Sequence, residues 1–265
     1  DFIVEKEYIL QEAEKLIAYK GNKAEIDVQI NSQGEPTMYY DLPGLVKGLK
    51  ELGVRHVSLI TNGTLIDKND IDALKDAGLD RVNLSLNAID RIAAIKVAGC
   101  KYDVEQIKDI AVYIASKMKL LIAPVLVPGI NDEEMIKLVR FSQALGAEIG
   151  IQNFLYYSKG RNPVEEKSWE EFYPMLRQIE AKTGASLIKS AADFGIVKTK
   201  PLEKPFRKGQ TIKAEVMCYG RYNNERIGAA RGRALILTNC SDEIGKKVNV
   251  VIIKDKHNLF IARAL

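Results

Sequence analysis

Five short polar stretches in the first 155 residues carry side chains that could hold a charged small molecule. The stretch Gly34-Glu35-Pro36-Thr37 offers a carboxylate, and Pro36 removes a backbone donor and keeps Glu35 extended. A turn that presents a carboxylate together with carbonyl oxygens suits a ligand ammonium group. The other four stretches are Thr61-Asn62-Gly63, Ser85 with Asn87, residues 127–132, and Gln152 with Asn153.

Strand and helix patterns alternate along residues 1–182. We expect strands at 25–30, 54–60, 82–86, 120–127 and 149–155, and helices at 5–19, 43–52, 70–77, 104–118, 131–145 and 168–182. Strands joined by helix-length connections are parallel, so their carboxyl ends meet at one edge of a sheet. All five polar stretches lie at or near that edge, where α/β proteins bind their ligands.

Local spacing also predicts how several helices begin. Asp41 is expected to cap the second helix, and Asn131 with Glu134 and Ser168 with Glu171 have the spacing of capping boxes. Each polar stretch has an ordinary interpretation as well, since an Asn-Gly pair or a Gly-Pro turn is common in loops. Their shared position at strand ends is what makes them a candidate site.

Two of the expected strands have one wholly polar face. The first strand alternates apolar residues with Asp27, Gln29 and Asn31, and the third with Asn83, Ser85 and Asn87. Such a face either lines a ligand cavity or is exposed to solvent at an open edge of the sheet, and we favour the interpretation as a cavity. The series also begins on a helix, so we expect one further strand upstream in a longer natural chain. The expected fold class is α/β, a partial TIM-type barrel of parallel βα units whose first strand is missing.

Charge divides the chain near residue 200. Residues 1–196 hold 24 Lys and Arg against 29 Asp and Glu, whereas residues 197–265 hold 15 against 6. The stretch 197–207 has prolines among charged residues, which is typical of a semi-rigid linker. We expect one domain at 1–196, the linker at 197–207 and a second domain at 208–265. The basic second domain indicates a polyanionic partner, and a basic surface without nucleic acid is the alternative.

The composition indicates a folded cytoplasmic protein with no membrane partner. The 265 residues are 46% hydrophobic and 28% charged, and the apolar runs are far shorter than the ~20 residues of a membrane span. Cys100, Cys218 and Cys240 are widely spaced and form no CxxC pair, which argues against a disulfide framework and against a structural zinc site. No secretory signal is visible in the first residues.

The order and spacing of the polar motifs resemble the radical S-adenosylmethionine superfamily across residues 1–196. The resemblance implies reductive cleavage of S-adenosylmethionine by a 4Fe-4S cluster, giving a 5′-deoxyadenosyl radical that removes a hydrogen atom from the substrate. It implies that Glu35 and the backbone of Gly34 receive the methionyl ammonium and that Ser85 and Asn87 bind the ribose or carboxylate. Residues 125–128 would pack by the adenine. The remaining implied contributors to cofactor binding are Pro36, Asn62 and Gln152.

One part of the superfamily pattern is absent from this sequence. In that superfamily three cysteines of a CxxxCxxC loop after the first strand hold the cluster, and the sequence has no such loop. We favour a longer natural chain, whose upstream segment supplies both the first strand and the cluster ligands, over a degenerate member without radical chemistry. The chain as given, with no metal ligands of its own, is therefore expected to be inactive.

Residues 208–265 show a different pattern of short alternating strands. Strands at 211–216, 226–230, 234–238, 247–253 and 259–262 predict a five-stranded OB-like barrel. The strand pattern and the length of this segment resemble those of the TRAM domain, a small RNA-binding barrel. The expected RNA-facing residues are Lys213, Arg221, Arg226, Arg231, Arg233 and Lys247. Tyr219 and Tyr222 either stack on bases beside them or pack in the barrel.

The two expected domains, 1–196 and 208–265, together predict a radical S-adenosylmethionine enzyme that modifies RNA. The expected substrate is tRNA, and the TRAM-like domain is expected to dock it. Two alternatives stay open. The first is a non-catalytic RNA-binding protein built on a degenerate barrel, and the second is a radical enzyme that acts on a protein or a small molecule.

Overall fold

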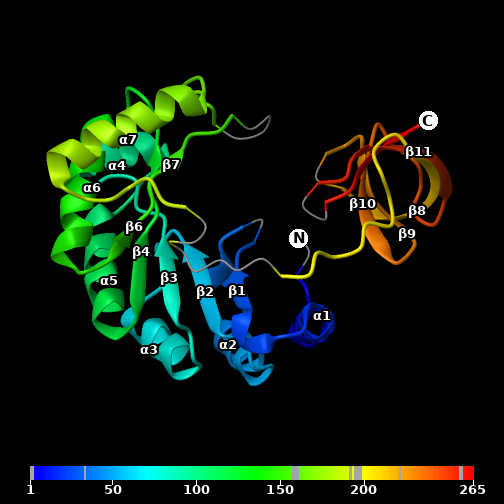
Figure 1. The fold of residues 1–265 in the computed structure, drawn as a ribbon, viewed down its shortest axis with the longest axis horizontal. Helices are drawn as coiled ribbons and strands as arrows, with labels where there is room; N and C mark the ends of the chain where they lie inside the picture. The colour runs from blue at the N-terminus through cyan, green and yellow to red at the C-terminus, as the bar shows by residue number, and fades with distance from the viewer. Residues whose placement is uncertain are drawn as a thin grey trace. The chain divides into compact units, whose positions relative to one another are not determined.

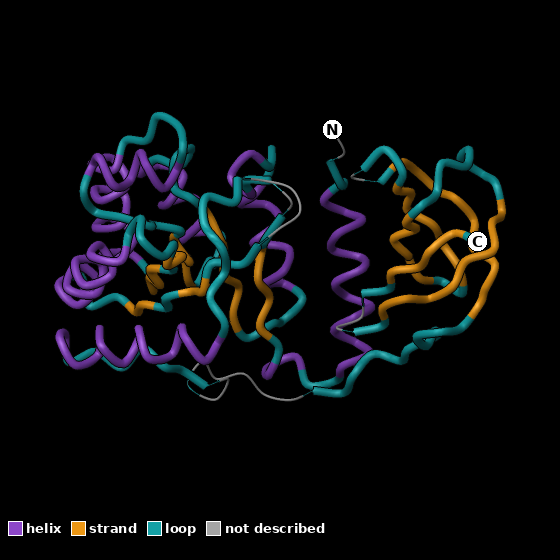
Figure 2. Tube along the Cα trace, turned by 90° about the horizontal axis from the view of Figure 1, so that it is seen from above, coloured by secondary structure: helices purple, strands orange, loops and turns teal. Residues whose placement is uncertain are grey.

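The computed structural model describes residues 3–32, 34–156, 161–190, 193, 199–220, 222–256 and 259–265. The chain forms two compact units, Asp1–Thr199 and Lys200–Leu265 (Figure 1). The first unit mixes helices and strands, whereas the second consists of strands and loops (Figure 2). No helix among the described residues is both long and apolar enough to cross a membrane.

The first unit is built around a five-stranded parallel sheet in the order β1-β2-β3-β4-β6. Its strands are β1 (Asp27–Ile30), β2 (His56–Thr61), β3 (Arg81–Leu84), β4 (Lys119–Ile122) and β6 (Glu148–Ile149). A second parallel pair joins β5 (Val125–Leu126) to β7 (Gln152–Asn153). Parallel strands joined by helices confirm the predicted fold class, a partial TIM-type arrangement of βα units.

Seven α-helices and two short 3₁₀ helices lie along the described part of the first unit. They are α1 (Lys6–Lys20), η1 (Lys23–Glu25), η2 (Pro36–Met38), α2 (Leu42–Glu51), α3 (Lys68–Asp76), α4 (Arg91–Ala98), α5 (Val104–Lys117), α6 (Asp132–Ala144) and α7 (Trp169–Thr183). Asp41 caps α2 by accepting from the Gly44 amide, and Ser168 with Glu171 forms a capping box on α7, as predicted. The helix α4 was not among those predicted.

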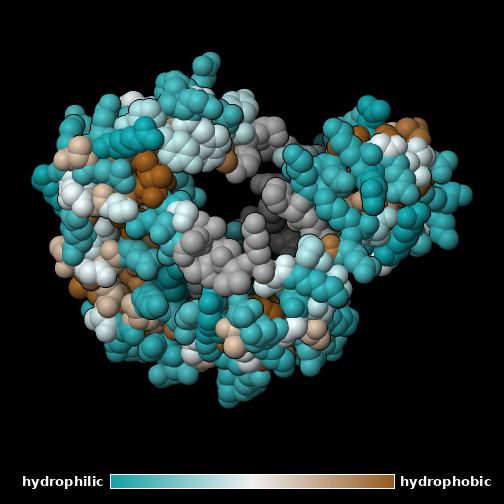
Figure 3. Space-filling model, viewed as in Figure 1, coloured by the Kyte–Doolittle hydropathy of each residue, from teal (hydrophilic) through white to brown (hydrophobic). Residues whose placement is uncertain are grey.

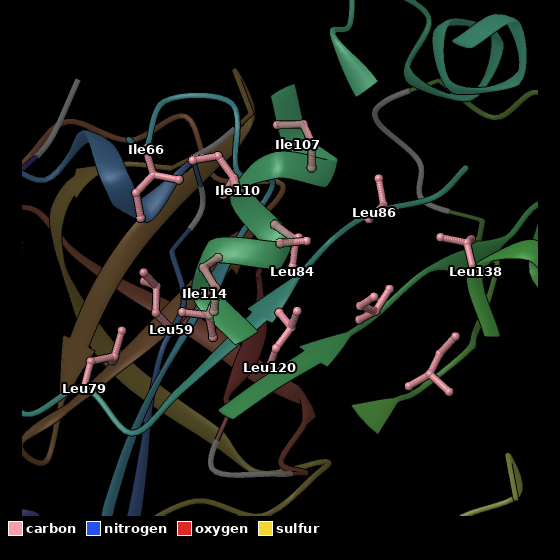
Figure 4. Close-up of a cluster of buried hydrophobic side chains, with 14 of the residues drawn as sticks. Leu59, Ile66, Leu79, Leu84, Leu86, Ile107, Ile110, Ile114, Leu120 and Leu138 are labelled. Carbon is pink, nitrogen blue, oxygen red and sulfur yellow. The ribbon is translucent and has the colours of Figure 1, made fainter. Parts of the chain in front are cut away.

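The core of this unit lies between the strands and the helices. Alternate residues of β2, β3 and β4 are almost fully buried, among them Leu59, Leu84 and Leu120. Figure 4 shows these side chains clustered with Ile107, Ile110 and Ile114 along α5. Because strand side chains alternate between faces, the residues between these leucines lie on the opposite face of the sheet, and many of them are polar.

Two of the predicted strands are broken. The expected strand at 120–127 is divided into β4 and β5, and that at 149–155 into β6 and β7. Pro124 has no amide to donate and lies between β4 and β5, so the regular ladder cannot continue through it. The chain resumes pairing beyond it, where the Gln152 amide donates to the Pro124 carbonyl at 2.8 Å. The carboxyl ends of these strands therefore bend into a separate pair.

The second unit is a closed five-stranded barrel in the order β10-β12-β11-β8-β9. Its strands are β8 (Thr211–Tyr219), β9 (Glu225–Ala230), β10 (Arg233–Thr238), β11 (Lys247–Lys254) and β12 (Ile261–Ala264). The third and fifth strands, β10 and β12, are parallel and the other pairs are antiparallel. Phe206 and Phe260 lie buried in its core in an edge-to-face pair 5.2 Å apart. This confirms the predicted OB-like barrel.

Candidate functional site

The side chain of Glu35 joins the carboxyl ends of β1 and β2. Its Oε1 accepts from the Thr37 amide at 3.2 Å, the Thr37 hydroxyl at 2.9 Å and the Thr61 hydroxyl at 2.7 Å. Its Oε2 accepts from the Asn62 amide at 3.0 Å. A carboxylate offers about four acceptor positions, so Oε2 keeps room for one further donor. The predicted residues Glu35 and Asn62 are thus brought together, with the carboxylate held at the sheet edge.

The turn that carries Glu35 is ordered by local hydrogen bonds. Pro36 is buried at the first position of η2, and the Ser32 hydroxyl donates to the Gly34 carbonyl at 2.8 Å. Gly34 itself is exposed, and a Cβ there would meet nothing within 4 Å. The carbonyl of Gly34 has a second lone pair, so both oxygens proposed to receive an ammonium group are present in one turn.

The turn after β2 requires a glycine. Asn62 Oδ1 accepts from the amide of Thr64 at 2.8 Å and from its hydroxyl at 2.6 Å, which closes an Asx-type turn. Gly63 has φ +77°, and a Cβ there would come within 2.8 Å of Leu84. The Asn62-Gly63 pair is therefore an ordinary turn by its backbone, and it also places the Asn62 amide on Glu35.

A second network joins the ends of β3 and β5. Asn87 Oδ1 accepts from the Val125 amide at 2.8 Å, and Asn131 Nδ2 donates to the carbonyls of Asn87 and Val125, both at 2.9 Å. Asn131 Oδ1 accepts from the Val127 amide at 2.7 Å. Asn131 is buried, so this one amide fixes the loop 125–131 against the end of β3.

The predicted capping box of Asn131 and Glu134 is wrong. Asn131 makes no side-chain cap on α6, since its amide is used by the loop. Glu134 is buried, and its Oε2 accepts from the amides of Ile89 at 2.7 Å and Asp90 at 2.8 Å, while Oε1 pairs with Lys137. Burial raises the pKa of the Glu134 carboxyl, but Lys137 and the two amides outweigh it and hold that pKa below its usual range.

The remaining predicted residues lie near these networks. Ser85 is half-buried just after β3, and its amide donates to the Thr61 carbonyl at 2.9 Å. Gln152 is exposed on β7, and its Nε2 donates to the Ala123 carbonyl at 3.3 Å. Sequence reasoning missed the bridging roles of Asn131 and Glu134, because each acts on a loop distant along the chain.

The chain offers no ligand set for an iron–sulfur cluster within its described residues. No group of three or more His, Cys, Asp and Glu side chains there could hold a metal ion. Cys100 and Cys218 are exposed and Cys240 is buried, and the first lies in a different unit from the other two. The residues present therefore do not fit a 4Fe-4S cluster, and no chemical step through one can be derived from them.

In the second unit, two predicted cations stack on the buried phenylalanines. The guanidinium carbon of Arg231 lies 5.6 Å from the Phe206 ring centre, and that of Arg233 lies 5.4 Å from the Phe260 ring centre. Arg231 Nη1 donates to the Pro205 carbonyl at 2.9 Å. Arg233 Nη2 is buried with no hydrogen-bond partner. The hairpin between β9 and β10 thus presents two guanidinium groups on an aromatic base.

The other predicted cations of the barrel differ in role. Lys213 and Lys247 are exposed on the adjacent strands β8 and β11. Arg226 is 8% exposed, and its guanidinium donates to four backbone carbonyls in the loops beside β9, those of Asn223, Glu225, Ser241 and Asp242. These bonds commit the guanidinium to holding the loops, and its contact with RNA stays a prediction. Arg221 lies outside the described residues.

Tyr219 is 71% exposed, and the Arg226 guanidinium carbon lies 4.8 Å from its ring centre. The ring is therefore a surface platform rather than part of the barrel core. The face of the barrel seen in Figure 3 is mostly hydrophilic.

Comparisons with known proteins found a family model, relatives in sequence and solved structures of similar fold. The family model described as the radical SAM superfamily matches residues 2–142. An uncharacterized protein of Methanocaldococcus jannaschii is 38% identical over 293 aligned positions, which cover 99% of this chain and 67% of that protein. A probable GTP 3′,8-cyclase of Saccharolobus islandicus is 38% identical over 150 positions, 55% of this chain and 46% of the cyclase.

The crystal structure of SuiB from Streptococcus suis is similar in fold, with a TM-score of 0.55 at 20% identity. The similarity covers 67% of this chain and 42% of SuiB. The chain thus spans about two thirds of the Methanocaldococcus protein and less than half of the cyclase and of SuiB.

Proposed function

The chain belongs to the radical S-adenosylmethionine superfamily, and from this premise we propose that the carboxyl edge of its parallel sheet binds S-adenosylmethionine. The held carboxylate of Glu35 is the observation that carries the proposal. Its Oε2 has one acceptor position left, and the Gly34 carbonyl lies in the same turn. An ammonium group there would gain a charge-assisted hydrogen bond without any rearrangement of the turn.

Three further predicted residues complete the proposed site. Ser85 and Asn87 follow β3, where they would bind the ribose or carboxylate, and Gln152 lies on β7 beside the Ala123 carbonyl. Asn131 and Glu134 act as positioning residues, because they fix the loop 125–131 and the turn at 89–90 that would flank the adenine. A rim fixed in this way lowers the entropic cost of ordering loops on binding.

Calorimetric titration of the chain with S-adenosylmethionine tests this site. We expect Glu35→Gln to weaken binding by about 10-fold, because a neutral amide replaces the charged partner of the ammonium. Glu51→Gln, at an exposed position of α2, is the matched control and should bind as the wild type does. No heat of binding at millimolar S-adenosylmethionine, or equal affinity of the two variants, would contradict the proposal.

The described residues contain no ligand set for a 4Fe-4S cluster, so we expect this chain by itself to bind none. Anaerobic reconstitution with iron and sulfide measures this directly. The chain should take up no stoichiometric cluster, and stable uptake would overturn this part of the proposal.

The substrate we propose is RNA, with tRNA as the expected class, docked by the TRAM-like second unit. Its strand order is that of an OB-like barrel, whose second and third strands commonly bind oligonucleotides. Here those strands are β9 and β10, and their hairpin presents Arg231 and Arg233. Residues 197–265 hold 15 basic and 6 acidic residues, and this surplus of positive charge supports a phosphate-bearing partner.

Fluorescence anisotropy with labelled tRNA, read at several salt concentrations, tests the RNA surface. The slope of log affinity against log salt concentration should be smaller by about 2 in the double variant Arg231→Gln with Arg233→Gln. Each lost phosphate contact removes about one unit from that slope. The control is Arg177→Gln with Lys182→Gln on exposed positions of α7. An unchanged slope and affinity in the first double variant would refute this surface.

A small-molecule substrate is the second candidate, and one finding favours it. An alignment of 150 positions, over 55% of this chain, matches a protein named as a probable GTP 3′,8-cyclase. Adding GTP as a competitor to the tRNA titration distinguishes a small-molecule substrate from an RNA substrate. Displacement of tRNA by micromolar GTP would favour a nucleotide substrate, whereas RNA binding that GTP leaves unchanged supports the RNA substrate.

A further inference from the structure

The amino end of the same sheet carries a second group of polar side chains, far along the strands from Glu35. In the strand register Ser58 of β2 is opposite Arg81 of β3, and Arg81 is opposite Lys119 of β4. Directly opposed residues of parallel neighbours point to the same face, so these three side chains form a row across the sheet. Asn83 lies two residues beyond Arg81 on β3 and therefore shares that face. Ser58, Arg81 and Lys119 line a pocket of about 270 Å³, and Asn83 is not among the described residues that line it.

Two atoms in this group are buried without a partner. Arg81 Nε and Asn83 Oδ1 have no hydrogen bond, and Asn83 is only 4% exposed. One is a donor and the other an acceptor. Buried polar groups in folded proteins are nearly always paired, and each exception needs an explanation such as an absent ligand. Arg81 lines the pocket, so its unpaired Nε indicates a ligand that accepts hydrogen bonds.

The charges of the row are also uncompensated. Arg81 and Lys119 are directly opposed, and like charges in that position repel. Within the described residues neither has a carboxylate within 4 Å of its charged nitrogens. The pocket does contain acids, but Asp27 is paired with Arg55 at 2.7 Å and Asp80 with Lys50 at 3.0 Å. These carboxylates are already neutralised by other cations.

Two acids of the pocket stand outside those pairs. Glu148 is exposed at the rim, and Asp193 accepts from the Ser190 amide and hydroxyl at 2.6 and 2.7 Å. Neither forms an ion pair with the opposed cations. His56 also lines the pocket, and its Nδ1 lies 3.2 Å from Asp27. The space between Arg81 and Lys119 therefore remains suited to an anionic group.

We propose that this pocket binds a small ligand whose oxyanion, a phosphate or a carboxylate, lies against Arg81 and Lys119. The Ser58 hydroxyl, on the same row, already donates to the Val28 carbonyl at 3.5 Å, so Arg81 and Lys119 are the proposed donors to the oxyanion. A volume of about 270 Å³ lies just below the range of typical drug-sized sites, so the ligand has a few carbons and is smaller than a nucleotide. The site is independent of the proposed S-adenosylmethionine site at the opposite end of the strands.

Calorimetric titration of the whole chain tests the site with inorganic phosphate, glycerol 3-phosphate and glycerate, at constant ionic strength. We expect binding of at least one, with Arg81→Gln and Lys119→Gln each weakening it about tenfold or more. Lys182→Gln on α7 is the charge-matched control and should not change it. Phosphate compounds binding in preference to glycerate identify the oxyanion as phosphate, and the reverse preference identifies it as carboxylate.

If Arg81→Gln does not fold, Lys119→Gln, at an exposed position, still tests whether the pocket binds an oxyanion. No binding of any of the three probes to the wild type, or equal binding by Lys119→Gln and Lys182→Gln, would overturn the proposal. Glu35→Gln should keep this binding even if it loses S-adenosylmethionine, which separates the two sites.

Discussion

The two ends of the parallel sheet use polar side chains in opposite ways. At the carboxyl edge Glu35 and Glu134 each accept from two or more backbone or hydroxyl donors, and Asn131 accepts from one amide and donates to two carbonyls. Their hydrogen bonds are therefore used to fix loops. At the amino end Arg81 and Asn83 each keep a buried atom without a partner. The first arrangement makes a rigid rim for a ligand, whereas the second leaves the hydrogen bonds for the ligand itself to make.

This difference gives opposite expectations for substitution at the two ends. Removing a side chain that satisfies buried donors leaves those donors unpaired, and that costs stability. Removing a side chain that is itself unsatisfied removes an existing cost. The carboxyl edge should therefore be sensitive to substitution in the absence of ligand, and the amino end should not.

The largest effect is expected at Glu134. Glu134→Ala leaves the amides of Ile89 and Asp90 without their acceptor and removes the partner of Lys137. We expect a loss of about 3 kcal/mol in the free energy of unfolding, because a buried charged acceptor of two amides is lost. Urea unfolding followed by circular dichroism measures it. Glu133→Ala, at the exposed neighbouring position, should change stability by less than about 0.5 kcal/mol.

A smaller loss is expected at Thr61, which is buried beside Glu35. Thr61→Val keeps the shape of the side chain but removes the hydroxyl that donates to Glu35 and accepts from the Gly63 amide. The expected cost is about 1–2 kcal/mol, since one buried amide loses its partner. Thr37→Val should cost less than about 1 kcal/mol, because the Thr37 amide still binds the same carboxylate. Equal losses in the two variants would show that the Thr61 link has no special role.

The alternation of strands and helices was largely predictable, because apolar periodicity reflects which face of each element is buried. The prediction failed where periodicity carries no information. Strand 120–127 is apolar throughout, yet Pro124 divides it, and α4 has little apolar stripe, with Ile92 exposed at 78%. The ends of α4 did carry signals, since Asp90 caps it and Gly99 ends it in a left-handed conformation.

The candidate sites were predictable only as far as local motifs reach. The Gly34-Glu35-Pro36 turn and the Asn62-Gly63 turn are local in sequence, so their positions could be read directly. Asn131 and Glu134 were misread as a capping box because their real partners lie more than 40 residues away or across a loop. The polar face of the third strand drew attention to Asn83, but Arg81 and Lys119 meet only through the strand register, which the sequence does not contain.

Acid should weaken the carboxyl edge through Glu134. The pKa of Glu134 is lowered from its usual 4.5 by Lys137 and two amides in spite of its burial. A carboxyl with a depressed folded-state pKa contributes stability above about pH 4.5 and loses it as the pH falls through the folded value. Urea midpoints between about pH 7 and pH 3 should therefore fall more steeply below about pH 4.5 for the wild type than for Glu134→Gln. Parallel curves would contradict this assignment.

The smallest effect is expected at Arg81, and it is the sharpest test of the contrast between the two ends. Arg81→Met keeps an unbranched chain of similar length and removes both the unpartnered Nε and the repulsion with Lys119. The free energy of unfolding should change by less than about 0.5 kcal/mol, or rise, because the lost group had no partner within the described residues. A loss of about 2 kcal/mol or more would mean that Arg81 is satisfied within the folded chain. The amino end would then be a structural network like the carboxyl edge, and its pocket would need no ligand to explain it.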